Sequence, residues 1–386
     1  MKMKVVAIKS IADVSSGTTP SRRKSEYWNG SIPWITTGEL ESGYVTASKE
    51  CVTEKALKET ALKLYHKGTV LIAMYGQGKT RGTAAVLGIE ATVNQACAAL
   101  TVHSGCPKFL FYQLQNSYHS IRKLSNTGNQ ENLNAEIIKN FKIPWPDELE
   151  QQKIAAILST QDKVIELKEK LLAQKQQQKK YLMQQLLTGK KRLPGFCEKW
   201  TRKQLGELFE NRVEINRSDL GLLAITSTRG ILPRDCLDLK DNSSEDKSKY
   251  LRICPGDIGY NTMRMWQGVS AYSEYEGIVS PAYTILAPME GVYSRYFAYL
   301  FKTQSVIFSF YRFSQGLVDD TRNLKYENFK KISVSIPSKV AEQRAIVQIL
   351  STADHEIELL QKSIEAEKQK KKALMQLLLT GKVRVK

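Results

Sequence analysis

Apolar residues recur in a heptad pattern in two long segments, residues 150–190 and 342–382. The positions of this register alternate in spacing between four and three residues until a polar gap, which is the coiled-coil repeat, and Gln161, Lys168 and Ala353 occupy three of them. The first apolar stripe consists of Ile154, Leu158, Ile165, Leu172, Leu182 and Leu186. The second consists of Ile346, Leu350, Ile357, Leu360, Ile364, Leu374 and Leu378. A glycine follows each stripe, at positions 189 and 381, where a helix C-terminal cap is expected. The pattern predicts two long helices.

These two segments are copies of one another. They align with a constant offset of 192 residues and without gaps, and 23 of the 41 aligned positions are identical. The offset is almost half of the 386 residues, so the chain consists of two tandem halves, each a globular block followed by a long helix. The predicted boundaries are a first block at 1–147, a first helix at 148–190, a second block at 191–338 and a second helix at 339–386.

A single amphipathic helix cannot bury its apolar stripe alone. We therefore expect the two copies to pack on each other, and an antiparallel pair with a pseudo-two-fold axis is the simplest arrangement. The alternative is that each helix docks only on its own block. Polar residues interrupt both stripes at equivalent positions, namely Lys175 and Lys179 in one copy and Glu367 and Lys371 in the other. The antiparallel register sets Lys179 opposite Ala353 and Lys371 opposite Gln161, where both ammonium groups are expected to reach water.

Both blocks mix short β-like runs with helices. Residues 69–74 and 98–102 are typical of strands, and residues 108–123 and 294–310 are predicted helices. The order of elements is similar in the two blocks, although identity between them is weak. The predicted fold class is α+β, with two tandem α/β domains joined by two long helices that form an antiparallel coiled coil. Similar helices and diverged blocks indicate a shared scaffold and two different recognition tasks.

Composition narrows the choice of partner. The net charge of +18 favours a nucleic acid or an anionic membrane surface. No apolar run is long enough for a membrane span and Met1–Ser10 has no signal-peptide character, so a nucleic acid is the better interpretation and no membrane is expected. A merely basic soluble protein is the alternative. The six cysteines form no CxxC pair and the four histidines are scattered, so zinc and disulfide scaffolds are not expected and a cytoplasmic location fits.

No catalytic motif is visible. Gly78-Lys79-Thr80 ends like a phosphate loop, but that motif needs a glycine where this chain has Ala73. The sequence also lacks a glycine-rich nucleotide-binding turn, an Asn-Pro-Pro-aromatic methyltransferase motif, a nuclease-type acidic cluster and an HExxH or Cys/His ligand set. We therefore expect no catalytic or metal-binding residue, and a basic, duplicated chain of this kind is interpreted as a binding and assembly subunit.

Candidate DNA-contacting residues lie in polar loops between the strands. Glutamine can pair with adenine and arginine with guanine, while lysine and threonine can hold phosphate. The first block offers Arg22, Arg23, Gln77, Lys79, Thr80, Arg81, Asn94, Gln95, Asn129 and Asn132. The second offers Arg264, Trp266, Gln267, Ser280, Gln315 and Arg322. Arg22 and Arg23 are expected to contact phosphate. A solvated turn is the alternative for each residue alone, but the match in position between the blocks favours DNA.

The duplicated helix has a recognisable ending in both copies, E-Q-x-x-I-x-x-I-L-S-T-x-D followed by L-M-Q-x-L-L-T-G-K. With the opening Ser16-Gly17-Thr18-Thr19-Pro20 and Pro33-Trp34-Ile35, the chain resembles the specificity (HsdS) subunit of type I restriction–modification systems over essentially its whole length. The second block has residues 211–218 in place of that opening, so its recognition domain is expected to be of a different subtype.

This resemblance implies a DNA-recognition role without catalysis. Each block would be a target recognition domain that reads one half of a bipartite, asymmetric double-stranded DNA sequence, and the helices would set the spacer. Two methyltransferase (HsdM) subunits and two restriction/translocase (HsdR) subunits would assemble on the chain. S-adenosylmethionine, ATP and magnesium would then belong to those partners, with no cofactor in this chain. A protein-binding coiled-coil adaptor and a nucleic-acid enzyme of unfamiliar motif are the competing hypotheses.

Overall fold

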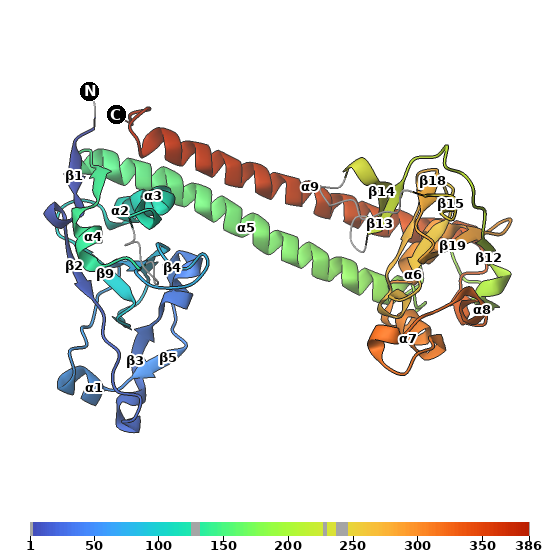
Figure 1. Cartoon of the computed structure of the whole chain (residues 1–386), viewed down its shortest axis with the longest axis horizontal. Coiled ribbons are helices and arrows are strands. Elements are labelled where there is room, and N and C mark those ends of the chain that lie inside the picture. Colours follow the sequence, from blue (N-terminus) through green and yellow to red (C-terminus); the bar gives the residue numbers. More distant parts are fainter. Residues whose placement is uncertain (1–2, 125–131, 227–229, 237–245, 386) are drawn as a thin grey trace. The chain divides into compact units, whose positions relative to one another are not determined.

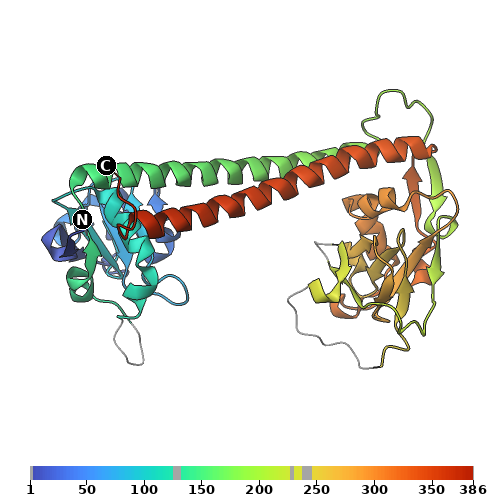
Figure 2. The same ribbon diagram turned by 90° about the horizontal axis from the view of Figure 1, so that it is seen from above.

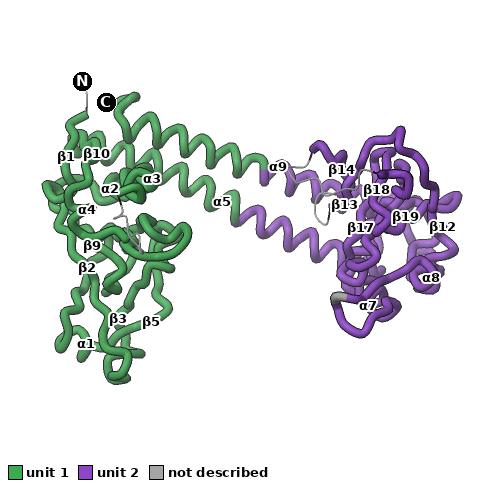
Figure 3. Tube along the Cα trace, viewed as in Figure 1, with its two compact units in different colours: residues 1–169, 362–386 green, residues 170–361 purple. Residues whose placement is uncertain are grey.

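The computed structural model describes residues 3–124, 132–226, 230–236 and 246–385, which form two compact units (Figure 1, Figure 3). Unit 1 consists of residues 1–169 and 362–386, and unit 2 of residues 170–361. Each unit therefore contains one globular block together with half of each long helix. The predicted domain boundaries instead cut the chain at the helix ends. The two divisions differ because the helix halves make their contacts with the block beside them and with each other.

The two long helices are α5 (Glu148–Leu186) and α9 (Val340–Leu378), each of 39 residues. Every residue of the two apolar stripes is buried or half-buried in the structure. The glycines that follow the helices, Gly189 and Gly381, adopt left-handed backbone with φ of 70° and 73°. A glycine pays no steric penalty there, which explains why both copies end at this residue type.

Within each unit the segments of α5 and α9 lie side by side (Figure 1, Figure 2). In unit 1, Lys371 pairs with Asp162 (2.6 Å) and Lys368 with Glu169 (2.7 Å). In unit 2, Lys175 pairs with Glu356 (2.7 Å), and Lys179 pairs with Asp354. Residue numbers rise along one helix as they fall along the other, so the helices are antiparallel, and this part of the predicted fold class is confirmed.

The globular part of unit 1 is built around a five-stranded sheet in the order β2-β9-β6-β7-β4, with a three-stranded sheet β5-β3-β8 and the pair β1-β10. Its elements are β1 (Val5–Ala7), β2 (Ala12–Ser16), β3 (Trp28–Ile35), β4 (Tyr44–Val45), β5 (Glu50–Val52), α1 (Glu54–Glu59), β6 (Val70–Ala73), β7 (Ala84–Leu87), β8 (Thr92–Val93), β9 (Cys97–Val102), α2 (Pro107–Asn116), α3 (Tyr118–Arg122), α4 (Ala135–Asn140) and β10 (Lys142–Pro144). Strands β6 and β7 are buried along their whole length, as expected for apolar runs at the centre of a domain.

The globular part of unit 2 repeats this plan. A four-stranded sheet in the order β12-β19-β16-β17 corresponds to β2-β9-β6-β7, and the pair β11-β20 corresponds to β1-β10. Its elements are β11 (Thr201–Gln204), β12 (Phe209–Arg212), β13 (Leu223–Thr226), β14 (Gly230–Pro233), β15 (Leu251–Ile253), β16 (Ile258–Asn261), β17 (Ser270–Tyr272), β18 (Gly277–Val279), β19 (Tyr283–Pro288), α6 (Ser294–Leu300), α7 (Gln304–Phe313), α8 (Tyr326–Phe329) and β20 (Ser333–Ile336). The weak sequence similarity between the blocks therefore reflects a shared fold.

Two predicted helices are each interrupted. The helix expected at 108–123 is split into α2 and α3 at Ser117, and the helix expected at 294–310 is split into α6 and α7. At the second break Thr303 is extended (φ −78°, ψ 143°), and its hydroxyl donates to the Leu300 carbonyl. The break keeps apolar residues on both sides in the core: Phe301 and Phe310 are fully buried. Packing therefore overrides the continuous apolar pattern that predicted one helix.

The end of each long helix completes the core of the block in its unit. Leu378 and Leu379, at the end of α9, belong to the apolar core of the first block, and Leu186 and Leu187 belong to that of the second. The Gln113 side chain of α2 donates to the Leu379 carbonyl over 2.9 Å in a buried position. Each block is thus closed by the helix of the other repeat.

Candidate nucleic-acid interface

In unit 1 the candidate loops gather at one end of the five-stranded sheet. Ser16 and Ile72 both pair with Ala98, and Ala73 pairs with Cys97, so these positions mark the same sheet end. The loop after β2, the loop between β6 and β7 and the turn before β9 all begin or finish there. The asparagine-rich segment reaches it as well, because Leu133 donates to the Met74 carbonyl (3.0 Å). Sheet register, and not proximity in sequence, brings these candidates together.

The loop between β6 and β7 is held by side chains from α3. The Tyr118 hydroxyl donates to the Lys79 carbonyl (2.7 Å), and the Arg122 guanidinium donates to the Arg81 carbonyl (2.7 Å). Gly76 and Gly78 adopt positive φ, which lets the loop fold back tightly. With the backbone fixed in this way, the side chains of Gln77 and Lys79 are exposed at the tip, and Thr80 is half-buried. An exposed glutamine and lysine on a fixed loop suit base and phosphate contact, respectively.

Arg81 lies in a different environment from its neighbours in this loop. Its side chain is only 8% exposed, although the sequence pattern placed it among the DNA-contacting residues. Arg81 therefore offers less surface to a ligand at the loop tip than its exposed neighbours Gln77 and Lys79 do. The structure therefore supports a role for Arg81 in shaping the loop. Nothing in the local pattern indicates this burial, because Arg81 lies between a polar tip and the next strand.

Arg22 and Arg23 are both exposed, but Arg22 also makes contacts within the protein. The Arg22 guanidinium lies 3.7 Å from the centre of the Trp28 ring and donates to Glu50 over 2.9 Å. The hydrogen bond from Arg22 lowers the pKa of Glu50, and that contact raises the pKa of Arg22. Because a carboxylate already balances its charge, Arg22 would attract a phosphate less strongly than Arg23 would.

Asn94 and Gln95 lie in the turn that leads into β9. The Thr19 hydroxyl donates to the Gln95 side-chain oxygen and so links the loop after β2 to this turn. The side-chain oxygen of Asn94 is buried and has no hydrogen-bond partner. Of the asparagines in the next loop, Asn132 is half-buried, and Asn129 lies outside the described residues. The interface of the first block therefore combines exposed polar tips with an acceptor that has no partner within the protein.

In unit 2 the corresponding candidates again gather at one end of the sheet. Asn261 pairs with Tyr283 and Arg212 with Ile285, so the turn after β16, the start of β19 and the loop after β12 share that end. Leu324 donates to the Thr262 carbonyl (2.9 Å), which brings residues 315–323 to the same place. Arg264, Gln267 and Gln315 are exposed there, and Trp266, Ser280 and Arg322 are half-buried.

A half-buried lysine, Lys302, supports the turn after β16. The Lys302 ammonium donates to the carbonyls of Gly268 (2.7 Å) and Ser270 (2.6 Å). Burial lowers the pKa of Lys302 to about 8. Gly268 takes positive φ (79°), and Met265 is fully buried, so the turn has a defined shape. These contacts orient Arg264 and Gln267 outward. Sequence reasoning missed Lys302, which lies outside every polar loop.

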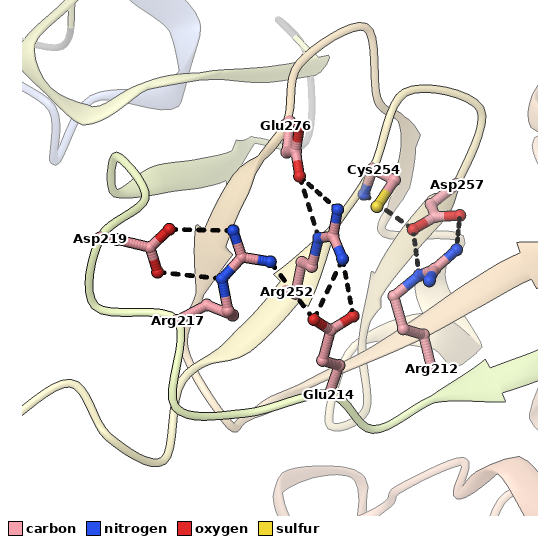
Figure 4. Close-up of polar contacts among 8 residues, drawn as sticks. All are labelled: Arg212, Glu214, Arg217, Asp219, Arg252, Cys254, Asp257 and Glu276. Atoms are coloured by element: carbon pink, nitrogen blue, oxygen red, sulfur yellow. Dashed lines mark hydrogen bonds and ion pairs between the residues drawn. The ribbon is translucent and has the colours of Figure 1, made fainter.

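The loop after β12 is fixed by a network of ion pairs that sequence analysis did not predict (Figure 4). Arg212 donates to the buried carboxylate of Asp257 over 2.8 Å, and the Cys254 backbone N–H donates to the same group. Arg252 bridges two carboxylates, Glu214 and Glu276. Hydrogen bonding from Arg252 lowers the pKa of Glu214. These pairs hold residues 212–219 against β15 and β18, at the position where the first block has its Gly-Thr-Thr-Pro opening.

Among the described residues, no helix has the combination of length and apolar character that a membrane crossing requires. The described part of the chain also has no cluster of three or more histidine, cysteine, aspartate or glutamate side chains able to hold a metal ion.

A family model for the type I restriction modification DNA specificity domain matches residues 1–177 and 246–368, which is most of the chain. The chain belongs to this family. The family resemblance inferred from the duplicated helix ending is therefore confirmed, and the two matched segments cover the whole first block, part of the second block and parts of both long helices.

Proteins similar to this chain are named as specificity subunits of type I restriction enzymes. The chain is 35% identical over 172 residues to the type I restriction enzyme MjaIX specificity subunit of Methanocaldococcus jannaschii, a match that spans 43% of this chain and 39% of the relative. It is 27% identical over 316 residues to the MjaVIII specificity subunit of the same organism, spanning 72% of this chain and 70% of the relative. A crystal structure of the type I restriction–modification S subunit from M. genitalium has the same fold, with a TM-score of 0.60 at 17% identity over 98% of this chain and 96% of that one.

Proposed function

We propose that this chain is the DNA-reading subunit of a type I restriction–modification complex. Each globular block would read one half of a bipartite, asymmetric target in double-stranded DNA. The paired helices would set the spacer between the two halves and dock the methyltransferase subunits. In this proposal the chain itself is not an enzyme.

One observation carries this proposal: polar residues gather at equivalent ends of two sheets that share a strand order but carry different side chains. The tip between β6 and β7 presents Gln77 and Lys79, whereas the turn between β16 and β17 presents Arg264 and Gln267. Glutamine and arginine make different contacts with base edges. The two blocks share one architecture but present different side chains. They would therefore recognise two different half-sites, and the complete target would be asymmetric.

The long helices support the second part of the proposal, because the same contacts recur in both units. Arg384 pairs with Glu150 in unit 1, and Arg192 pairs with Glu342 in unit 2, with both members displaced by 192 positions. A repeated scaffold that holds two different readers is what a fixed spacer requires. The net charge of +18 fits a polyanionic partner.

Catalysis would then reside in the partner subunits. We infer that two methyltransferase subunits and, for restriction, two translocase subunits assemble with this chain in the cytoplasm. S-adenosylmethionine, magnesium and ATP would be bound by those subunits. The competing hypothesis is a coiled-coil adaptor that binds only proteins. Such an adaptor would show no sequence preference in DNA, so a DNA-binding measurement distinguishes it from a DNA-reading subunit.

The test is an exchange of recognition domains in cells that carry the chain with its methyltransferase subunit. Mapping methylated bases across the genome gives both half-sites and the spacer for the wild type. Replacement of residues 1–147 by the corresponding block of another family member should change one half-site and leave the other half-site and the spacer intact. Replacement of residues 191–338 is the matched experiment and should change only the other half. A methylation pattern that neither exchange alters would refute the proposal.

A further inference from the structure

Residues 315–323 form a small hairpin in unit 2. Gln315 and Asn323 exchange two backbone hydrogen bonds, of 2.8 Å and 2.7 Å. Gly316 has φ of 129°, and a Cβ atom there would lie 2.7 Å from the Arg322 Cα atom, so the two sides of the hairpin meet closely. Thr321 donates from its backbone to the Val318 carbonyl (3.1 Å) and closes the turn. The hairpin is therefore an internally bonded protrusion.

The apex of the hairpin displays apolar side chains to solvent. Leu317 is 100% exposed and Val318 is 59% exposed. Leu317 contributes no apolar burial to the fold, although leucine is among the residues most often found inside proteins. Single exposed apolar residues are common on protein surfaces, so this pair is informative because it lies at the apex of an internally bonded protrusion.

A stacked platform supports the base of this apex. The Arg322 guanidinium lies 4.1 Å from the centre of the Tyr311 ring and 6.0 Å from that of Trp266. Arg322 also donates to Tyr311 and to Asp319, each over 3.3 Å, so the charge of Asp319 is partly offset. Its side chain is only 14% exposed. Arg322, assigned from sequence as a DNA contact, thus serves here to position the hairpin.

The surroundings of the hairpin favour DNA as the occupant. Leu324 is bonded to Thr262, so the hairpin lies at the same sheet end as the candidate residues Arg264 and Gln267. Arg264 and Arg312 are both exposed, and the exposed carboxylate of Asp319 in the hairpin is paired with Arg322. The apex is therefore continuous with the surface assigned to DNA reading. Proteins that kink DNA insert apolar side chains, leucine among them, between base steps.

We propose that Leu317, flanked by Val318, is an apolar wedge that inserts between two adjacent base pairs in the half-site read by the second block. Insertion would bury the leucine against base faces and partly unstack one step. The wedge adds recognition through deformability, because flexible pyrimidine–purine steps are opened more easily than others. The inference rests on the proposed DNA-reading function.

The experiment uses the chain in complex with its methyltransferase subunits and a duplex that carries the target from the methylation map. 2-Aminopurine, whose fluorescence rises on unstacking, is placed at successive positions of the second half-site. The wild-type complex should raise the 2-aminopurine fluorescence at one base-pair step of the second half-site. The Leu317→Ser variant should lose that rise and bind roughly tenfold more weakly, as expected for the loss of one buried leucine contact. The Leu317→Met variant should retain it.

Controls separate the wedge from other effects. Met289 is an equally apolar surface residue, 41% exposed, and it follows β19 at the opposite end from the hairpin, so the Met289→Ser variant should keep both the rise and the affinity. The thermal midpoint of the Leu317→Ser variant should equal that of the wild type, because Leu317 buries no surface. A rise at the base that the methyltransferase flips should persist in every variant.

Two results would overturn the wedge. The first is an unchanged 2-aminopurine rise in the Leu317→Ser variant. The second is loss of methyltransferase assembly in that variant while DNA unstacking persists, which would make Leu317 a protein contact. Failure of the proposed function is distinguishable, since it appears earlier, as a methylation pattern that does not respond to exchange of residues 191–338.

Discussion

Lys179 of α5 donates a hydrogen bond to Asp354 of α9, and the same carboxylate accepts one from the Tyr299 hydroxyl over 2.7 Å. The equivalent group in unit 1 consists of Lys371, Asp162 and Tyr112. In each unit the three side chains come from the two long helices and from the globular block. Each group therefore joins three separate elements at one polar point of the helix seam. Burial and the nearby carboxylate raise the pKa of both tyrosines, so they remain protonated donors.

These polar groups should stabilise the helix pair in a measurable way. We expect a coupling free energy of about 0.5–1 kcal/mol between Asp162 and Lys371, because the pair is only partly shielded from solvent. A double-mutant cycle with Asp162→Asn and Lys371→Met, followed by chemical unfolding, gives this value. The exposed pair of Glu169 and Lys368 is the control and should show little coupling, since both side chains are 49% exposed. Equal coupling free energies in the two cycles would contradict the claim that the Asp162–Lys371 pair stabilises the helix pair more than the exposed pair does.

The contact between Glu150 and Arg384 should make unit 1 sensitive to acid. The hydrogen bond from Arg384 is the main cause that lowers the pKa of Glu150 below its usual value of 4.5. A carboxylate with a lowered pKa contributes stability above its unfolded pKa, and that contribution is lost as the pH falls through the folded pKa. The difference in thermal midpoint between the wild type and Arg384→Met should therefore be largest above about pH 5 and shrink toward about pH 3. The exposed Arg23→Met variant is the control, and a pH-independent difference for Arg384→Met would rule the linkage out.

The loop between β6 and β7 should separate affinity from specificity. Replacing Lys79 by alanine should weaken binding to all duplexes and reduce the salt dependence by about one phosphate contact. Replacing Gln77 by alanine should instead relax base preference at one position of one half-site. Salt titrations and methylation mapping of both variants check this pair of outcomes. If Gln77→Ala leaves the methylated sequence unchanged, this loop is not the reader of the first block.

Spacer length should follow helix length. Every inter-helix ion pair described above lies within one unit, so a heptad inserted after Glu169 and a matched heptad after Gln361 preserve all of them. One heptad adds about 10 Å of helix. B-DNA rises about 3.4 Å per base pair, so the spacer in the methylation map should grow by about three pairs with both half-sites intact. The same heptad inserted in α5 alone is the control and should impair modification, because α9 can no longer match it. An unchanged spacer in the variant with both insertions would refute the proposal that helix length sets the spacer.

Sequence patterns predicted the helix pair well because its information is local and repeated. The heptad spacing identified the buried stripe, and the offset of 192 residues set the antiparallel register to within one residue. The environment expected for Lys179 and Lys371 differs from the one that the structure shows. Lys179 and Lys371 were expected to reach water beside Ala353 and Gln161, but each turns to the adjacent aspartate. The aspartate lies one position along the helix and is only partly shielded from solvent, so its negative charge attracts the ammonium group.

Contacts between distant parts of the blocks were beyond sequence reasoning. Tyr112 and Tyr299 lie 50 and 55 positions from the aspartates they bind, and Arg212 lies 45 positions from Asp257. Nothing in the local pattern marks these partners, because they depend on how the sheets fold. The burial of Arg81 has the same origin. Polar loops could be identified as candidates, but which of their side chains point outward depends on supports such as Tyr118 and Lys302.

The closure of the first block by Leu378 and Leu379 has a consequence for synthesis. The ribosome makes the first block about 230 residues before the helix end that completes its core, an interval of roughly 12–46 s at ordinary elongation rates. During that time the nascent block presents the apolar surface that later receives the two leucines, and the Gln113 amide has only one of its two acceptors, the Pro144 carbonyl. The first block made is therefore the last to be finished, so ribosome pausing within residues 170–361 prolongs exposure of that surface to chaperones and proteases.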